Sequence, residues 1–344
     1  MKCPSLTELP PPPPGRSGWP WTTETPPPAA SDAAADWPRI TIVTPSFNQA
    51  EFIEETIRSV LLQGYPDLEY FVIDGGSTDG SVDIIRKYAS HLAGWTSEAD
   101  RGQSHALNKG FARASGQVHA FLNSDDRYES GALQAVATHM RHGHRWVAGQ
   151  VRFTSGGETI GLVPQQPDGR FTAWFLTCPV AQPGSFWTAE LHRFAGPFRE
   201  DFACLFDYEF WLRLRFAREA EPASLARAVA VYRLHPQSKS SSMAAVFARE
   251  AKAIRAEYIE RLNRGQRVRL WLARRHRKAR WHGSRVIPCA REGRYTAAAG
   301  QLLKAFGNWP LLPFDRGIVL AARQWTGNYY PPPDFPDLTR DWDD

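Results

Sequence analysis

Two adjacent carboxylates, Asp125 and Asp126, follow directly on the short apolar run from Val118 to Leu122. Such a run is typical of a buried strand, and open α/β sheets bind their ligands at strand exits. Neighbouring acids repel each other unless a cation or hydrogen-bond donors compensate, so this pair favours a divalent metal that takes oxygen ligands. A metal at this place would in turn hold phosphate. The other interpretation is that the two aspartates only cap the helix that follows, a common role for Asp.

The elements that would position this pair alternate between strands and helices. The predicted elements are strands at 40–43, 70–73 and 118–122 and helices over 53–61, 82–88 and 103–114. This alternation indicates parallel βαβ units with right-handed crossovers, so the three strand exits open on the same edge of one sheet. Each exit is polar, with Thr44–Ser46 after the first strand and Asp74 after the second. The sequence therefore predicts one ligand site built from three distant segments.

We expect three regions along the 344-residue chain. Residues 1–37 are rich in proline and alanine, which predicts a disordered tail. Residues 38–242 hold an α/β catalytic domain with a mainly parallel central sheet, and residues 243–344 form a helical, basic C-terminal extension. The four cysteines show no metal-ligand or redox spacing, and no apolar segment has the length of a signal peptide or a transmembrane helix. These features predict a cytoplasmic protein.

Six motifs of the chain, in the same order, resemble those of family-2 glycosyltransferases. They are Pro45–Asn48, Val72–Gly80, Asn108–Gly110, Asn123–Asp126, Asp207–Arg213 and Tyr232–His235. The resemblance covers roughly Pro38 to Ser242. It implies the GT-A nucleotide-sugar-binding fold and an inverting transfer of a sugar from a nucleotide-diphosphate donor, expected to be a UDP-sugar, to a hydroxyl group.

The resemblance also implies how the donor is held. Asp74 would bind the base of the nucleotide, Pro45 and Ser46 would line the same pocket, and Asp125 would lie against the ribose or the donor sugar. One departure concerns Gly75, which stands where many members of the family have a second Asp.

The resemblance also implies which residues bind a metal ion and which residue acts as the general base. Asp126 would ligate Mn²⁺ or Mg²⁺, and His235 matches a histidine that approaches the metal or the pyrophosphate. Asp207 matches the general base, although Asp207-Tyr208 replaces the paired acids that are usual there. A carboxylate at this place would take the proton of the attacking hydroxyl; the alternative is that Asp207 caps a helix. The other candidate bases are Glu200, Asp201 and Glu209.

Asp100 and Arg101 come just before the helix predicted from Gln103. Because free amides at a helix N-terminus attract phosphate, Arg101 could reinforce donor binding there. A solvated loop is the alternative.

Residues 261–285 carry ten arginines and lysines and no acid, interleaved with leucine and tryptophan. This composition suits a helix lying on an anionic membrane, where each basic residue adds about 1 kcal/mol, and it would bring the enzyme to a lipid-linked acceptor or a growing surface polysaccharide. Peripheral attachment to the inner face of the cell membrane is one expectation, and a solvated helix is another. Nucleic-acid binding is a weaker alternative.

Two other functions compete with sugar transfer. A non-catalytic nucleotide- or polyanion-binding protein could keep the same sheet without turnover. A Rossmann oxidoreductase is disfavoured because residues 75–80 lack the Gly-x-Gly-x-x-Gly phosphate turn.

Overall fold

The computed structural model describes residues 1–29, 36–163, 171–218 and 220–308. They divide into two compact units. The first comprises residues 1–29, 36–163, 178–218 and 220–252, and the second comprises residues 171–177 and 253–308. The helical extension was predicted to begin at residue 243, but the second unit begins at 253 and also takes in the short segment 171–177.

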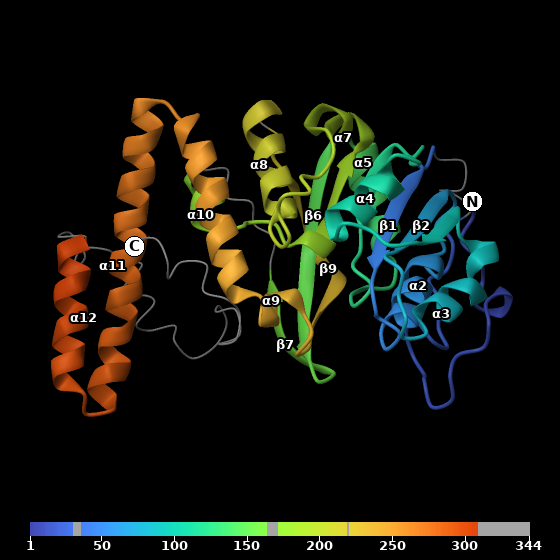
Figure 1. Ribbon diagram of the computed structural model, residues 1–344, viewed down its shortest axis with the longest axis horizontal. Helices are drawn as coiled ribbons and strands as arrows, with labels where there is room; N and C mark the ends of the chain where they lie inside the picture. Colours follow the sequence, from blue (N-terminus) through green and yellow to red (C-terminus); the bar gives the residue numbers. More distant parts are fainter. Residues whose placement is uncertain (30–35, 164–170, 219, 309–344) are drawn as a thin grey trace. The chain divides into compact units, whose positions relative to one another are not determined.

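The first unit is built on one mixed sheet (Figure 1). In the described part of the chain this sheet has nine strands in the order β3-β2-β1-β4-β8-β6-β9-β5, with β7 paired to β6. The strands are β1 Ile40–Ser46, β2 Leu68–Asp74, β3 Gly94–Ser97, β4 Val118–Phe121, β5 Arg127–Tyr128, β6 Trp146–Ser155, β7 Glu158–Val163, β8 Ser185–Thr188 and β9 Ala223–Leu234. Strands β2, β1 and β4 are parallel, as predicted, and β3, which was not predicted, is parallel to β2. Strand β8 is antiparallel to both β4 and β6.

Helices connect these strands, and their bounds follow the apolar periodicity closely. The α-helices of the first unit are α2 Ile53–Leu61, α3 Ser81–Lys87, α4 Gln103–Phe111, α5 Ala132–Arg141, α7 Ala189–Ala195, α8 Phe206–Arg218 and α9 Lys239–Ser242. Short 3-10 turns lie at Leu6–Glu8, Ala89–His91 and Gln182–Gly184. Helix α10, Ala244–Glu260, begins in the first unit. The predicted α/β class with a mainly parallel central sheet is confirmed.

The prediction of a disordered tail is wrong for residues 1–29. Arg58 of α2 is fully buried, and its guanidinium donates hydrogen bonds to the carbonyls of Pro10 (2.8 Å), Pro20 (3.1 Å) and Trp21 (2.9 Å). A proline-rich chain offers carbonyls that its own backbone amides do not use, and a buried guanidinium needs such acceptors. The partner that orders the segment is therefore a residue of α2, far away in the sequence.

The second unit is helical. It contains α6 Phe171–Leu176, α11 Arg264–Arg291 and α12 Tyr295–Asn308, and α11 and α12 pack side by side as a hairpin (Figure 1). Arg275 of α11 donates to the carbonyl of Asn308 at 3.0 Å, and His282 lies 2.6 Å from the side chain of Gln301. None of the helices in the described residues combines the length and the apolar character needed to span a bilayer.

Candidate active site

The carboxyl ends of β1, β2 and β4 meet at one edge of the sheet. Ser46 at the end of β1 pairs with Asp74 at the end of β2, and the amide of Leu122 donates to the carbonyl of Val43 at 3.1 Å. The outer two of these strands are two strand spacings apart, about 10 Å. The prediction that the three polar strand exits share an edge is confirmed, and Pro45 and Ser46 are buried there.

Asp74 is fully buried and its carboxylate is occupied by its own chain. One oxygen accepts hydrogen bonds from the amides of Gly76 (3.0 Å) and Ser77 (2.8 Å) and from the hydroxyl of Ser97 (2.7 Å). The other oxygen accepts from the hydroxyl of Ser77 at 2.5 Å. Three of these bonds go to Oδ2 and one to Oδ1, so Oδ1 keeps room for one further donor. Asp74 therefore shapes the loop after β2, and its predicted contact with a nucleotide base stays a prediction.

Gly75, the departure noted in the sequence, has a structural explanation. A Cβ atom on Gly75 would lie 2.8 Å from Oδ2 of Asp100 and 3.3 Å from the ring of Phe47. Asp100 thus fills the space that a side chain at position 75 would need, and its other oxygen accepts from the amide of Gly102 at 2.8 Å. The Phe47 ring is 60% exposed beside it. Sequence reasoning missed Phe47, because an aromatic residue after a strand is more often part of the core.

Arg101 lies at this edge but is paired with an acid. Its guanidinium contacts the Glu200 carboxylate at 2.6 Å, and the Arg101 side chain is 68% exposed. Hydrogen bonds from Arg101 and Asn108 lower the pKa of Glu200. A carboxylate with a lowered pKa is a weaker base, which argues against Glu200 as the proton acceptor.

The remaining candidate bases are also engaged in ion pairs. Asp201 contacts Arg199 at 2.5 Å, and this interaction lowers the pKa of Asp201. Glu209 is buried and paired with Arg213 at 2.9 Å.

The acid pair after β4 has an uncompensated oxygen. Asp126 is 1% exposed, and its Oδ1 accepts from the amide of Arg233 at 3.0 Å. Its Oδ2 is buried and has no hydrogen-bond partner among the described residues. Burial, followed by the negative charge of Asp125, raises the pKa of Asp126 well above its usual range. An orphaned carboxylate oxygen beside a second acid is an arrangement that a cation would stabilise.

His235 reaches this pair through Asp125. Its Nε2 lies 3.1 Å from Oδ2 of Asp125 and its Nδ1 lies 3.1 Å from the side chain of Gln237. The hydrogen bond to Asp125 raises the pKa of His235. The ring packs against Phe52, with centroids 4.6 Å apart. The predicted ligands Asp126 and His235 therefore flank Asp125.

The donor atoms fit a divalent cation that takes most of its ligands from a substrate. The described residues contain no cluster of three or more His, Cys, Asp or Glu side chains arranged to hold a metal. The free oxygen of Asp126 leaves most coordination positions to phosphate oxygens and water, as magnesium and manganese accept. The His235 imidazole would join such a cation only by giving up its hydrogen bond to Asp125.

Asp207 lies in the first turn of α8, where its carboxylate accepts from the amide of Tyr208 at 2.7 Å. Burial raises the pKa of Asp207 to about 6. The Lys239 ammonium is within electrostatic range of both Asp125 and Asp207. Lys239 thus links Asp207 electrostatically to the acid pair. The role of Asp207 as the base, and the alternative that it caps α8, both stay predictions.

Two buried polar residues of α2 and a third just after its end hold the loop that carries the acid pair. Thr56 and Ser59 are spaced i and i+3 on one face of α2, and Gln63 follows two residues after the helix ends. Their bonds are Thr56 Oγ1 to the carbonyls of Ser124 (2.8 Å) and Asp126 (2.6 Å), the Tyr128 amide to Ser59 Oγ (3.1 Å), and Gln63 Nε2 to the Glu129 carbonyl (3.0 Å). Their position on an otherwise apolar helix face was the signal available in the sequence.

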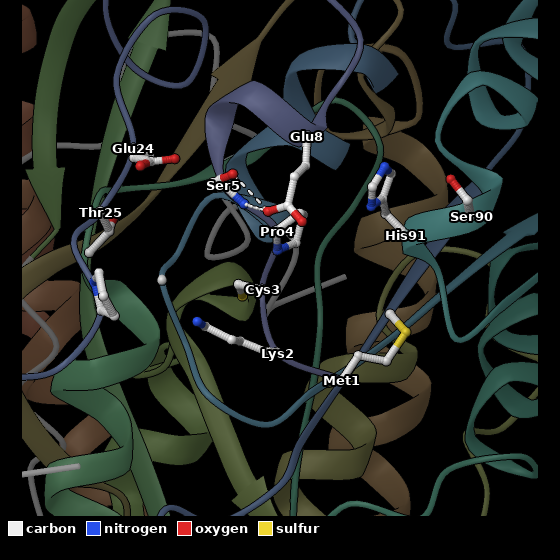
Figure 2. Close-up of a pocket in the computed structure, with 12 residues that line it drawn as sticks. Met1, Lys2, Cys3, Pro4, Ser5, Glu8, Glu24, Thr25, Ser90 and His91 are labelled. Atoms are coloured by element: carbon white, nitrogen blue, oxygen red, sulfur yellow. Dashed lines mark hydrogen bonds between the residues drawn. The ribbon is translucent and has the colours of Figure 1, made fainter.

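A cavity of ≈ 460 Å³ lies elsewhere in the first unit (Figure 2). It is lined by residues of the N-terminal segment, among them Cys3, Glu8 and Thr25, together with Gly64 and His91. None of the predicted site residues lines it, so it plays no part in the site at the sheet edge.

Comparison with known proteins agrees with the motifs. Residues 41–198 match the family described as glycosyl transferase family 2. The uncharacterized glycosyltransferase Rv1514c of Mycobacterium tuberculosis is 32% identical over 194 residues, which cover 55% of this chain and 72% of that protein. The GalNAc(5)-diNAcBac-PP-undecaprenol beta-1,3-glucosyltransferase of Campylobacter jejuni is 28% identical over 116 residues, 33% of this chain and 38% of that protein.

Among solved structures, the mannosyltransferase PcManGT from Pyrobaculum calidifontis, in complex with GDP-Man and Mn²⁺, superposes with a TM-score of 0.52 at 20% identity. The match covers 85% of this chain and 84% of that one, and it shows the GT-A-like fold. The chain matches most of the length of the mycobacterial relative, and it carries the six motifs and the acids at the sheet edge. It therefore belongs to glycosyl transferase family 2 and is a glycosyltransferase.

Proposed function

We propose that this enzyme transfers a sugar, with inversion, from a nucleotide-diphosphate sugar to a hydroxyl acceptor at the edge formed by β1, β2 and β4. The observation that carries the proposal is the buried, unpartnered Oδ2 of Asp126 beside Asp125, within the described residues. A buried carboxylate oxygen without a hydrogen-bond partner, beside a second acid, suits a bound cation and the diphosphate that the cation would hold.

The donor base would lie over Gly75. The exposed Phe47 ring offers a face for stacking, and the Asp100 carboxylate offers a hydrogen-bond acceptor beside a backbone that carries no side chain. Asp74 would hold this loop through Oδ2, and its Oδ1, which accepts one hydrogen bond, would take a donor of the base as predicted. A carboxylate acceptor suits the N–H of uracil, so a UDP-sugar is the proposed donor.

Asp126 and His235 would hold Mn²⁺ or Mg²⁺, with Asp125 against the ribose or the donor sugar. The metal, when bound, supplies positive charge to the departing diphosphate. The imidazole favours Mn²⁺ over Mg²⁺ among these two cations. Arg101 would contribute to phosphate binding only after exchanging its Glu200 partner for the donor.

Asp207 would take the proton of the acceptor hydroxyl as that oxygen attacks the anomeric carbon. Its pKa of about 6 keeps it mostly ionised at pH 7 while leaving it more basic than an ordinary carboxylate. Attack opposite the leaving group inverts the configuration of the anomeric centre.

The acceptor would be a saccharide on a lipid carrier, reached in the cytoplasm at the inner face of the membrane. The Campylobacter relative bears a PP-undecaprenol acceptor in its name, and residues 261–285 of this chain are basic without an acid. On α11, Val268, Trp271 and Leu272 lie on one face and are 51%, 54% and 39% exposed. Apolar side chains surrounded by arginines suit the interface of an anionic bilayer.

The test is a panel of nucleotide sugars with Mn²⁺, read as donor hydrolysis and as transfer to lipid-extracted acceptors. Wild-type protein should consume one donor, and Asp126→Asn should lower the rate at least a hundredfold. Asp83→Asn, which changes an exposed acid of α3, is the control and should keep full activity. Binding of UDP without turnover of any donor would favour the non-catalytic alternative instead.

A further inference from the structure

We propose that Glu250 is a positioning residue for Asp207, because its carboxylate holds the backbone that leads into α8. This inference rests on the proposed function of Asp207 as the base. It adds a residue of α10 that no motif of the chain includes.

The Glu250 side chain is 5% exposed and binds three consecutive backbone amides. Its carboxylate accepts hydrogen bonds from Ala203 N at 2.7 Å, Cys204 N at 3.0 Å and Leu205 N at 2.9 Å. Hydrogen bonds to an ionised carboxylate are about twice as strong as neutral ones. Because a negative charge at a helix N-terminus also interacts favourably with the helix dipole, Glu250 fixes the start of α8.

The same peptide segment is held from its other side by Lys239. The Lys239 ammonium donates to the carbonyl of Ala203 at 2.9 Å and to the side chain of Gln103 at 2.9 Å. The Gln103 amide in turn donates to the side chain of Asn123 at 2.6 Å. A continuous path of hydrogen bonds therefore joins the start of α8 to the loop that carries the acid pair.

This path fixes the distance between the base and the proposed diphosphate site. Asp207 follows Leu205 by two residues, so a shift of the 203–205 backbone moves its carboxylate. A displacement of about 1 Å in a reacting group can cost on the order of a hundredfold in rate. Glu250 thus acts on catalysis through Asp207 without touching substrate.

The charged and titratable groups that face Asp207 are Glu250, Lys239, Cys204 and Tyr232. Glu250 raises the pKa of Asp207, and Lys239 lowers it. Removing either charge should therefore move the acid limb of the pH–rate profile, and the two removals should move it in opposite directions.

The experiment compares Glu250→Gln, Glu250→Asp and Lys239→Met with the wild type. We expect Glu250→Gln to lower kcat about tenfold with the donor KM changed less than twofold, and to shift the acid limb of the kcat profile to lower pH. Glu250→Asp keeps the charge and should leave the limb in place, although its shorter reach should still lower kcat. Lys239→Met should shift the limb to higher pH.

Glu257→Gln is the matched control, because it removes an acid farther along α10 that pairs with Arg261. It should leave kcat and the profile unchanged. Wild-type kcat and an unshifted limb in all three test variants would overturn the role of Glu250. If Glu250→Gln does not fold, the other two variants decide. An unchanged kcat in Glu250→Asp together with an unshifted acid limb in Lys239→Met would also overturn the role of Glu250. Lack of turnover by the wild type with every donor would instead contradict the proposed function.

Discussion

The hydroxyl of Thr56 on α2 lies 2.6 Å from the main-chain carbonyl of Asp126. This contact places a buried helix residue directly behind the proposed metal ligand, with a second contact to the carbonyl of Ser124 at 2.8 Å. The helix therefore controls where the acid pair stands relative to the sheet edge.

Thr56→Val should weaken the response to metal more than it weakens the fold. Valine keeps the shape but leaves the two carbonyls without the hydroxyl, a loss of about 1 kcal/mol in unfolding free energy. We expect the Mn²⁺ concentration for half-maximal activity to rise at least fivefold, and Thr56→Ser to restore it. The measurement is initial rate against Mn²⁺ at saturating donor.

The control is Thr41→Val at the opposite end of β1. Thr41 is fully buried and its hydroxyl donates to Glu69 at 2.6 Å, so the variant loses a comparable bond away from the site. An equal rise in the Mn²⁺ requirement for both variants would mean that Thr56 has only a structural role.

Two buried histidines should make the fold sensitive to acid. Burial lowers the pKa of His119 to about 4 and that of His192 to about 3, and their ring centroids are 5.1 Å apart. The folded state keeps both neutral, whereas the unfolded chain binds protons near pH 6.5. The unfolding free energy therefore has its full value above pH 6.5 and falls as the pH drops below 6.5. It stops falling once the rings are protonated in the folded state as well.

By linkage, each ring lowers the unfolding free energy at pH 5 by about 2 kcal/mol, compared with a pH at which the ring is neutral in both the folded and the unfolded state. The measurement is urea unfolding at pH 7 and pH 5. His119→Leu should remove about half of the loss, because the two rings contribute about equally and this variant removes one of them. A loss of the same size in this variant would show that other groups cause the acid sensitivity.

Arg58 should be required for the packing of the N-terminal segment. Arg58→Leu leaves the carbonyls of Pro10, Pro20 and Trp21 without their donor, and we expect a loss of about 3 kcal/mol in unfolding free energy. Limited proteolysis should then cut within residues 1–29 faster than in the wild type. Arg86→Leu, at an exposed arginine of α3, should change neither measurement.

Trp271 should contribute to membrane binding. In sedimentation with vesicles containing 30% phosphatidylglycerol, Trp271→Ala should lower the bound fraction several-fold, because its exposed ring would insert at the interface. Added salt should weaken binding of the wild type, as expected for an arginine-rich surface. Ile160→Ala, at an exposed apolar residue of β7, is the control, and equal binding to purely zwitterionic vesicles would contradict the proposal.

The sequence predicted the site best where local periodicity decides the structure. Asp74, Asp125 and Asp126 end apolar runs, so their shared edge followed from parallel βαβ units. The packing of Arg58 against the N-terminal prolines and the contact of Glu250 with the start of α8 join residues that are far apart in sequence. No periodic pattern records such contacts, and the same holds for the insertion of antiparallel β8 beside β4.

The bare backbone at Gly75 lets the Asp100 carboxylate occupy the space in which a side chain at position 75 would begin. A designer who wished to place an acid on the loop after β2 would therefore have to turn away or replace the Asp100 side chain as well. Adding a carboxylate at position 75 alone would displace the end of the Asp100 side chain and bring two acids together, whereas exchanging the two residues would keep a single acid there.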